Sequence, residues 1–180
     1  MGKIYLGTQG GVPFVYNDFV GIEREVSEQG VYKLVSSNYS WRVPDDATSV
    51  GERCLQYAFQ YCTGLTSADF NNVTTIERFG IQYAFQYCTN LTTVSLSKVS
   101  SIAAGSCFQY AFRGCTSLTT ISFPALTTSS FGNIVNQFSN MISGCTGVTL
   151  HFPSTVQSQV SSLNGYPNFG GTNTTVLFDL

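Results

Sequence analysis

The sequence is short of charge. Only 10% of its 180 residues are Asp, Glu, Lys or Arg, and the net charge is −2, whereas charged residues usually make up about 25% of a soluble domain. Ser, Thr, Asn and Gln supply the polarity instead. A protein that binds nucleic acid or an anionic membrane normally presents a basic patch. This composition offers no such patch, so neither partner is expected.

Long apolar runs are also missing. No stretch approaches the roughly 20 apolar residues that a membrane-spanning helix needs. The opening residues, MGKIYLGTQGG, do not combine a basic segment with an apolar one, so no secretory signal is predicted. We therefore expect a protein that is neither exported by the standard route nor inserted in a membrane.

What the chain does have is a repeated motif. Three close copies read QYAFQYCTGLT, QYAFQYCTNLT and QYAFRGCTSLT (56–66, 82–92 and 109–119), and a weaker fourth, SNMISGCTGVT, covers 139–149. The aligned cysteines are Cys62, Cys88, Cys115 and Cys145, so the period is 26, then 27, then 30 residues. A period of this length predicts a solenoid, in which each unit is one coil that buries its apolar face against its neighbours.

The cysteines are expected to be core residues. Cys62, Cys88, Cys115 and Cys145 occupy one position of successive coils, and Cys54 and Cys107 share another. Both positions lie among apolar residues, where a free cysteine acts as a small hydrophobe. Buried, reduced thiols are favoured, with disulfides as the alternative. No metal site is predicted, because the close cysteine pairs typical of zinc sites are missing.

Each unit is expected to contain two elements. QYAFQYC is interpreted as a helical turn or short helix, and the segment after it as a strand. In a strand, alternate side chains face opposite sides of the sheet. The predicted inward residues are Leu65, Ala68, Phe70, Leu91, Val94, Leu96, Leu118, Ile121, Phe123, Val148, Leu150 and Phe152.

The two ends of the chain do not repeat. Residues 3–6 and 12–16 flank a glycine-rich turn and predict a hairpin within an attachment segment, 1–30. The highly charged stretch 21–30 suggests a short helix or linker. The solenoid is predicted over 31–163, with a degenerate first coil at 31–53 and repeats at 54–163. A capping loop and strand are predicted over 164–180.

Two surfaces are candidates for binding. The outward columns of the predicted sheet contain Ser67, Thr93, Thr120 and Thr149, and beside them Asp69, Ser95, Ser122 and His151. Small hydroxyls can meet a glycan or a protein at low desolvation cost; the alternative is a merely solvated face. The second surface is a ridge of Tyr57, Tyr61, Tyr83, Tyr87 and Tyr110. Tyrosine is enriched at interfaces, but simple packing between coils is the alternative.

Catalysis is not predicted. His151 is the single histidine, and a Ser-His-Asp arrangement needs its members within hydrogen-bonding distance. Asp69 is three coils away in the same column, about 15 Å at about 5 Å per coil. No glycine motif of the kind that holds phosphates is present. We therefore expect neither enzymatic activity nor a cofactor.

The pattern AF-x-x-C-x-x-L-x-x-(V/I)-x-(L/F), at Ala58–Phe70, Ala84–Leu96 and Ala111–Phe123, resembles BspA-like leucine-rich repeats. The resemblance implies an α/β solenoid of right-handed coils with a parallel sheet along one side, and it transfers no catalytic residue. Many such proteins are bacterial or protozoan surface proteins that bind host matrix or other cells. Similar repeats also occur in bacteriophages.

A short array without an export signal favours a bacteriophage virion component, in a tail, fibre or decoration role. Residues 1–30 are then expected to contact other virion proteins or a second copy of the chain, while the repeats bind a host glycan or protein. A bacterial cell-surface adhesin and an intracellular protein-interaction module are the alternatives.

Overall fold

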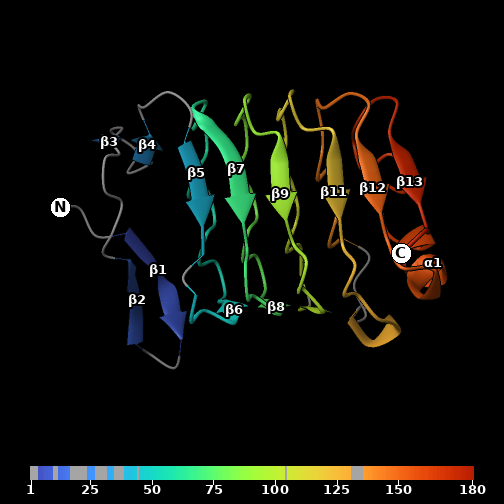
Figure 1. Ribbon diagram of the computed structural model, residues 1–180, viewed down its shortest axis with the longest axis horizontal. Helices are drawn as coiled ribbons and strands as arrows, with labels where there is room; N and C mark the ends of the chain where they lie inside the picture. The colour runs from blue at the N-terminus through green and yellow to red at the C-terminus, as the bar shows by residue number, and fades with distance from the viewer. Residues whose placement is uncertain are drawn as a thin grey trace.

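The computed structural model describes residues 4–9, 12–16, 24–26, 32–34, 39–43, 45–103, 105–130 and 136–180. Most of them wind into a parallel-sheet β-solenoid of about five turns, in which successive coils lie side by side (Figure 1). The solenoid that the repeat predicted is confirmed. Within these residues, none of the helices combines the length and the apolarity that crossing a bilayer requires.

The larger sheet takes one strand from each coil. Its strands are β5 (Tyr39–Arg42), β7 (Leu65–Asp69), β9 (Thr93–Ser95), β11 (Thr120–Ser122), β12 (Thr149–His151) and β13 (Thr175–Leu177), adjacent in that order. Thr93 lies opposite Ser67 on one side and Thr120 on the other. A slip of one residue would turn the apolar set of a strand outward, so the apolar pattern fixes this register.

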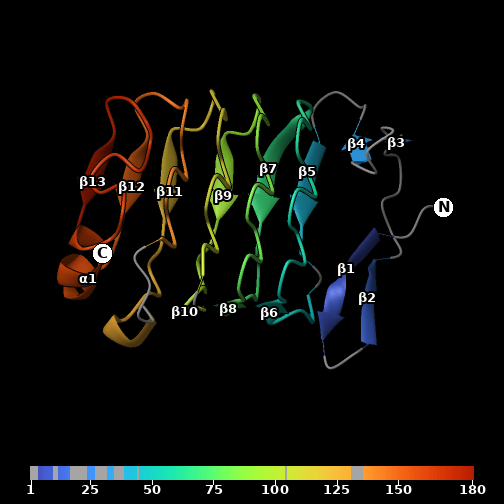
Figure 2. The same cartoon turned by 180° about the vertical axis from the view of Figure 1, so that it is seen from behind.

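A smaller parallel sheet forms a second side of the coils. It consists of β6 (Ser49–Val50), β8 (Thr75–Ile76) and β10 (Ser101–Ile102) (Figure 2). The second residue of each strand is buried. In the later coils the corresponding stretches contain the 3-10 helices η1 (Thr128–Ser130) and η2 (Ser154–Val156), the latter followed by the short helix α1 (Gln157–Ser161).

The third side consists of tight turns, which corrects the expectation that QYAFQYC is helical. Along this segment, backbone N–H groups donate alternately to a carbonyl of the same turn and to a carbonyl of the next coil. Ala58 N donates to Leu55 O within the turn (3.0 Å), whereas Phe59 N donates to Ala84 O of the next coil (2.8 Å). A helix would use these groups internally. Tyr57 and Tyr61 both have a positive φ, 60° and 62°, so the same turn conformation recurs every four residues. Side chains four residues apart also share one face of a helix, and the sequence pattern therefore fits either structure.

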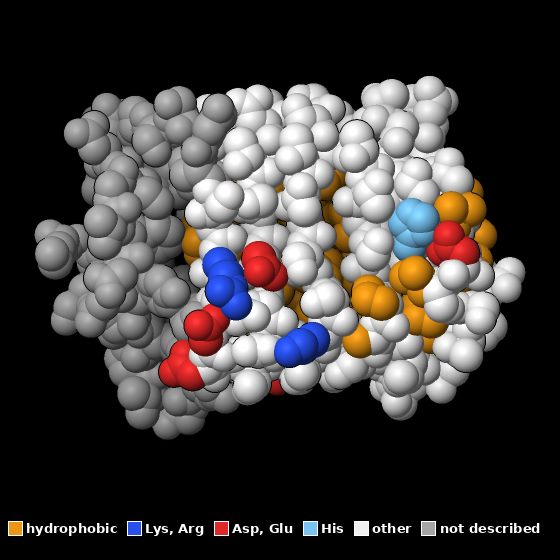
Figure 3. All heavy atoms as spheres, in the orientation of Figure 1, with side chains coloured by type: hydrophobic (Ala, Val, Ile, Leu, Met, Phe, Trp, Pro, Cys, Tyr) orange, Lys and Arg blue, Asp and Glu red, His pale blue; other side chains and the backbone are white. Residues whose placement is uncertain are grey.

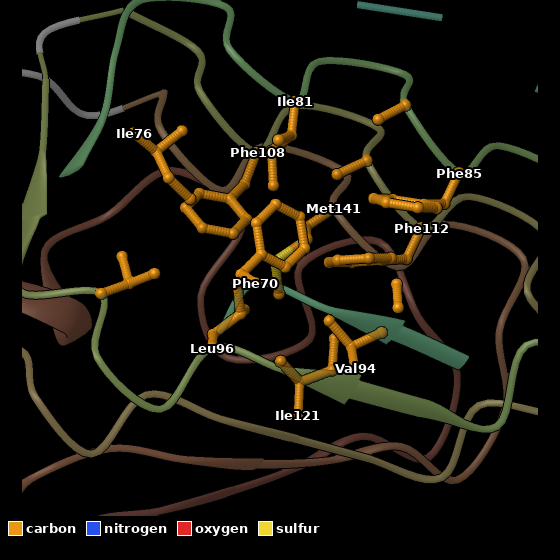
Figure 4. Packing of buried hydrophobic residues seen from close by; sticks show 14 of the residues in the cluster. Phe70, Ile76, Ile81, Phe85, Val94, Leu96, Phe108, Phe112, Ile121 and Met141 are labelled. Atoms are coloured by element: carbon orange, nitrogen blue, oxygen red, sulfur yellow. The ribbon is translucent and has the colours of Figure 1, made fainter. Parts of the chain in front are cut away.

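The core runs the length of the solenoid as ladders of equivalent residues. The ring of Phe85 stacks between Phe59 and Phe112, with centroids 5.2 and 5.6 Å apart, and Figure 4 shows part of this packing. At the first strand, Trp41 packs on Phe59 at 4.7 Å. All twelve inward residues predicted for the strands are buried, which confirms the predicted alternation.

At the N-terminal end, the expected hairpin is present. β1 (Ile4–Gln9) pairs antiparallel with β2 (Val12–Tyr16). The charged stretch 21–30 departs from the predicted helix or linker, because β3 (Arg24–Val26) pairs antiparallel with β4 (Tyr32–Leu34). Local composition could not reveal this partner.

At the C-terminal end, residues 164–180 supply the expected strand. β13 pairs in parallel with β12, and Thr172 bridges to Thr146. The segment therefore continues the register of the preceding coils. In that register Gly171 takes the position that Cys145 holds one coil earlier.

Candidate functional site

The outward side chains of the large sheet form two columns, and Figure 3 shows this side of the molecule with its charged residues coloured. Strand pairing brings Ser67, Thr93, Thr120 and Thr149 into one column and Asp69, Ser95, Ser122 and His151 into the other. The structure extends the first column with Ser40 and Thr175, and the second with Arg42 and Leu177. Thr93 and Thr120 are exposed, and Ser95 and Ser122 are half-buried.

Charged side chains lie near both ends of this sheet face, and Lys98, which follows β9, donates to Asn72 Oδ1. Near the first strands, Arg42 Nη2 lies 2.9 Å from Asp45 Oδ1, and Arg42 Nε lies 3.5 Å from Asp69 Oδ2. At the last strands, His151 Nδ1 lies 2.9 Å from Asp179 Oδ1. The strands between them, β9 and β11, contain no charged residue. The outward side chains of these two strands are therefore polar and uncharged.

Asp179 is the partner of His151 that sequence reasoning missed. Asp69, in the same column, was expected to be too distant, and it lies on β7, three strands from β12. Asp179 follows β13 by two residues, and pairing of β13 with β12 brings it beside the imidazole. The available signal was weak, because it required the tail to be aligned as one more repeat.

The tyrosines form two stacked columns on the turn side. Tyr57 and Tyr83 stack with centroids 4.8 Å apart, and Tyr83 and Tyr110 at 5.0 Å. Tyr61 and Tyr87 stack at 5.0 Å in the second column. These separations match the spacing of adjacent strands, about 4.8 Å, so the rings stack because the coils do. Burial raises the pKa of Tyr83, and the neighbouring tyrosines raise it further.

The polar groups of this turn face bond to one another. Gln56 Nε2 donates to Gln82 Oε1, and Gln82 Nε2 donates to Gln109 Oε1, both at 2.6 Å. A second amide contact joins the two glutamines that precede Tyr61 and Tyr87. The guanidinium of Arg113 lies 5.6 Å from the Tyr87 ring and 5.5 Å from the Tyr110 ring. Much of the turn face is thus engaged in holding coils together.

The aligned cysteine thiols also bond to the neighbouring coil. Cys88 Sγ donates to Phe59 O at 3.0 Å, Cys115 Sγ to Phe85 O at 3.1 Å, and Cys145 Sγ to Phe112 O at 3.2 Å. None of the six cysteines, all of which lie in the described residues, forms a disulfide. Burial raises the pKa of Cys54 and Cys145 to about 11. These thiols are therefore neutral at pH 7 and act as packing and hydrogen-bonding groups.

Comparison with protein families identifies the repeats. The model of the BspA type leucine rich repeat region, in six copies, matches residues 32–163. The match covers more than half of the chain, so the protein belongs to this family. Leucine-rich repeats of this kind indicate a protein-interaction or adhesion module. No curated protein and no solved structure matches the chain.

Proposed function

We propose that the protein is a non-enzymatic adhesion module and that the sheet face is its binding surface. The observation that supports this choice is the uncharged hydroxyl surface across β9 and β11, which lies between the Arg42 ion pairs and the hydrogen bond of His151 to Asp179. A ligand can cover this centre without stripping water from a charge, which is the costly step in burying polar surface. A host glycan or a host protein is the proposed ligand.

The proposed setting is a bacteriophage virion, assembled in the host cytoplasm, in a tail, fibre or decoration role. Residues 1–30 attach the protein to neighbouring virion proteins, and the repeats remain outside for binding. Two features support this division: the first 30 residues lie ahead of the family match, which begins at residue 32, and charge is concentrated in the N-terminal third. A bacterial cell surface is the second setting that the family resemblance favours.

Binding is tested with two variants that separate the two surfaces. The sheet-face variant combines Thr93→Lys and Thr120→Lys, both at exposed positions. The turn-face variant combines Tyr57→Ser and Tyr61→Ser, whose side chains are 40% and 48% exposed. On arrays of host glycans and matrix proteins, the sheet-face variant is expected to lose binding and the turn-face variant to keep it. The opposite result would assign binding to the tyrosines, and silence of the unmodified protein would remove the adhesion proposal.

Attachment is tested by deleting residues 1–30. The truncated protein is expected to give the circular dichroism spectrum of a folded solenoid. It is expected to be missing from purified particles. Its presence in particles at the normal level would refute the attachment role. A Lys3→Ala substitution serves as a matched control that leaves the segment in place.

A further inference from the structure

Among the described residues, the last coil has no further coil paired with it. β13 pairs with β12, and within the described residues no strand pairs with its other edge (Figure 1). The inward residues of the last coil, Val176 in β13 and Phe178 just after it, are only half-buried. Their equivalents one coil earlier, Leu150 and Phe152, are 0% exposed. Among the described residues, this edge therefore exposes the backbone N–H and C=O groups of β13 that pair with no strand, together with part of the apolar side chains of Val176 and Phe178.

Apolar side chains gather at the same end. Five large hydrophobic residues are exposed in the described part of the chain, and three of them, Tyr166, Leu177 and Leu180, belong to this coil. Leu177 continues a column that is otherwise polar along the sheet face. Its side chain is 37% exposed, so a contact at this edge would remove hydrocarbon from water.

The usual protections of an edge strand are missing here. Natural edges carry charged residues, a proline within the strand, or a covering element. Residues 152–178 include no Asp, Glu, Lys, Arg or His, and β13 includes no proline. The first charge is Asp179, which is bonded to His151 of the same chain. An unprotected edge strand is a template for pairing with another strand.

We propose that β13 is a docking edge for a second copy of this chain, whose own β13 adds antiparallel about a twofold axis perpendicular to the sheet. The low charge of this edge favours this partner. A contact between two such edges brings together strands that hold no charged residue, with Asp179 two residues beyond each strand. The opposite end of the sheet carries Arg42 with Asp45 and Asp69, and covering those ion pairs costs desolvation energy. A twofold contact also closes, whereas head-to-tail addition would continue into a filament.

The two aspartates do not oppose this arrangement. If the antiparallel pair is centred on Val176, the two copies of Asp179 lie six positions apart along the strand direction, about 20 Å at about 3.4 Å per residue. The screening length at ordinary ionic strength is about 10 Å. Their repulsion is therefore largely screened. The resulting twelve-stranded sheet would carry both sheet faces on the same side.

The first experiment measures the mass of the full chain by sedimentation velocity over a concentration series. The unmodified protein is expected to form a dimer that dissociates on dilution. Leu177→Lys places a charge on the exposed side of the edge and is expected to raise the dimer Kd at least tenfold. Thr120→Lys, an exposed position in the middle of the sheet, is the matched control and should leave the Kd unchanged.

Either of two results would overturn the proposal: a monomer at the highest concentration, or a Leu177→Lys variant that dimerises as well as the unmodified chain. Circular dichroism checks that both lysine variants are folded. If Leu177→Lys unfolds, Thr175→Lys, on the same strand and also exposed, replaces it with the same expectation.

The second experiment locates the interface with spin labels at Thr175→Cys or Thr93→Cys. The native thiols are largely buried and their pKa values are raised, so the unmodified protein gives the background. In the proposed dimer the two labels at 175 lie about 8 Å apart, and those at 93 about 34 Å, because Thr93 is three strands from the edge and strands are about 4.8 Å apart. A dimer through the N-terminal hairpin would leave the 175 labels far apart and would refute this interface.

Discussion

A single alanine at Gly114 should destabilise the protein more than the same change at Gly144. The two glycines are equivalent: each precedes an aligned cysteine, and their φ angles are +70° and +78°. A Cβ at Gly114 would lie 2.4 Å from Cδ1 of Tyr87, whereas at Gly144 the nearest atom is 3.7 Å away. The pair therefore separates the effect of backbone conformation from the effect of displacing a ring.

The backbone effect is shared by both variants. A left-handed conformation costs an alanine about 1–2 kcal/mol, and the lower entropy of the unfolded chain returns about 0.4–1 kcal/mol. Gly144→Ala is thus expected to lose about 1 kcal/mol. In Gly114→Ala the Tyr87 ring must also leave its stack on Tyr61 and its contact with Arg113. Each contact is worth about 0.5–1.5 kcal/mol, so the total loss should be about 2–4 kcal/mol.

The assay is urea unfolding followed by far-ultraviolet circular dichroism, with the near-ultraviolet signal reporting the tyrosines. A double-mutant cycle with Tyr87→Ala completes the test, because removing the ring should abolish the extra loss in Gly114→Ala. Equal destabilisation of the two glycine variants would refute the reasoning. It would show that the ring moves aside without losing its contacts.

Three further predictions concern the core, the thiols and the sheet face. Phe85→Ala should cost about 3–5 kcal/mol, because its ring is 0% exposed between Phe59 and Phe112; Phe178→Ala, at the half-buried last coil, should cost less in the same urea assay. Stability should fall as pH rises above 9. The folded pKa of Cys54 is raised from 9.0 to about 11, so the thiol stabilises the fold below pH 9, and between these pH values it increases the unfolding constant about tenfold per pH unit. Thermal unfolding from pH 8 to 11 checks this, and Cys54→Ala should make the dependence less steep, although Cys145 and the other buried thiols still contribute; an unchanged slope would contradict it. Arg42→Ala should change the free energy of unfolding by less than about 1 kcal/mol, because its ion pairs are exposed.

The repeat alone predicted the coils, the sheet register and the core. The reason is that inward and outward residues alternate at fixed positions in every unit, and a register slip would expose Leu65, Val94 and Ile121 together. The glutamine ladder of Gln56, Gln82 and Gln109 could be predicted in the same way, and its bonds are present. Equivalent positions of stacked coils must be neighbours in space.

The turn segments and the ends required the tertiary structure. A motif such as QYAFQYC has a spacing that fits a helix, and only the neighbouring coil, which accepts every second N–H, makes consecutive turns the better solution. The link between His151 and Asp179 and the open edge of β13 likewise depend on which strand lies beside which. The sequence by itself determined that there are coils and which residues they bury. The tertiary structure decided which surfaces are available to a partner. Hydrogen bonds between coils engage the polar groups of the turn face, whereas the sheet face and the edge of β13 remain accessible in the described residues.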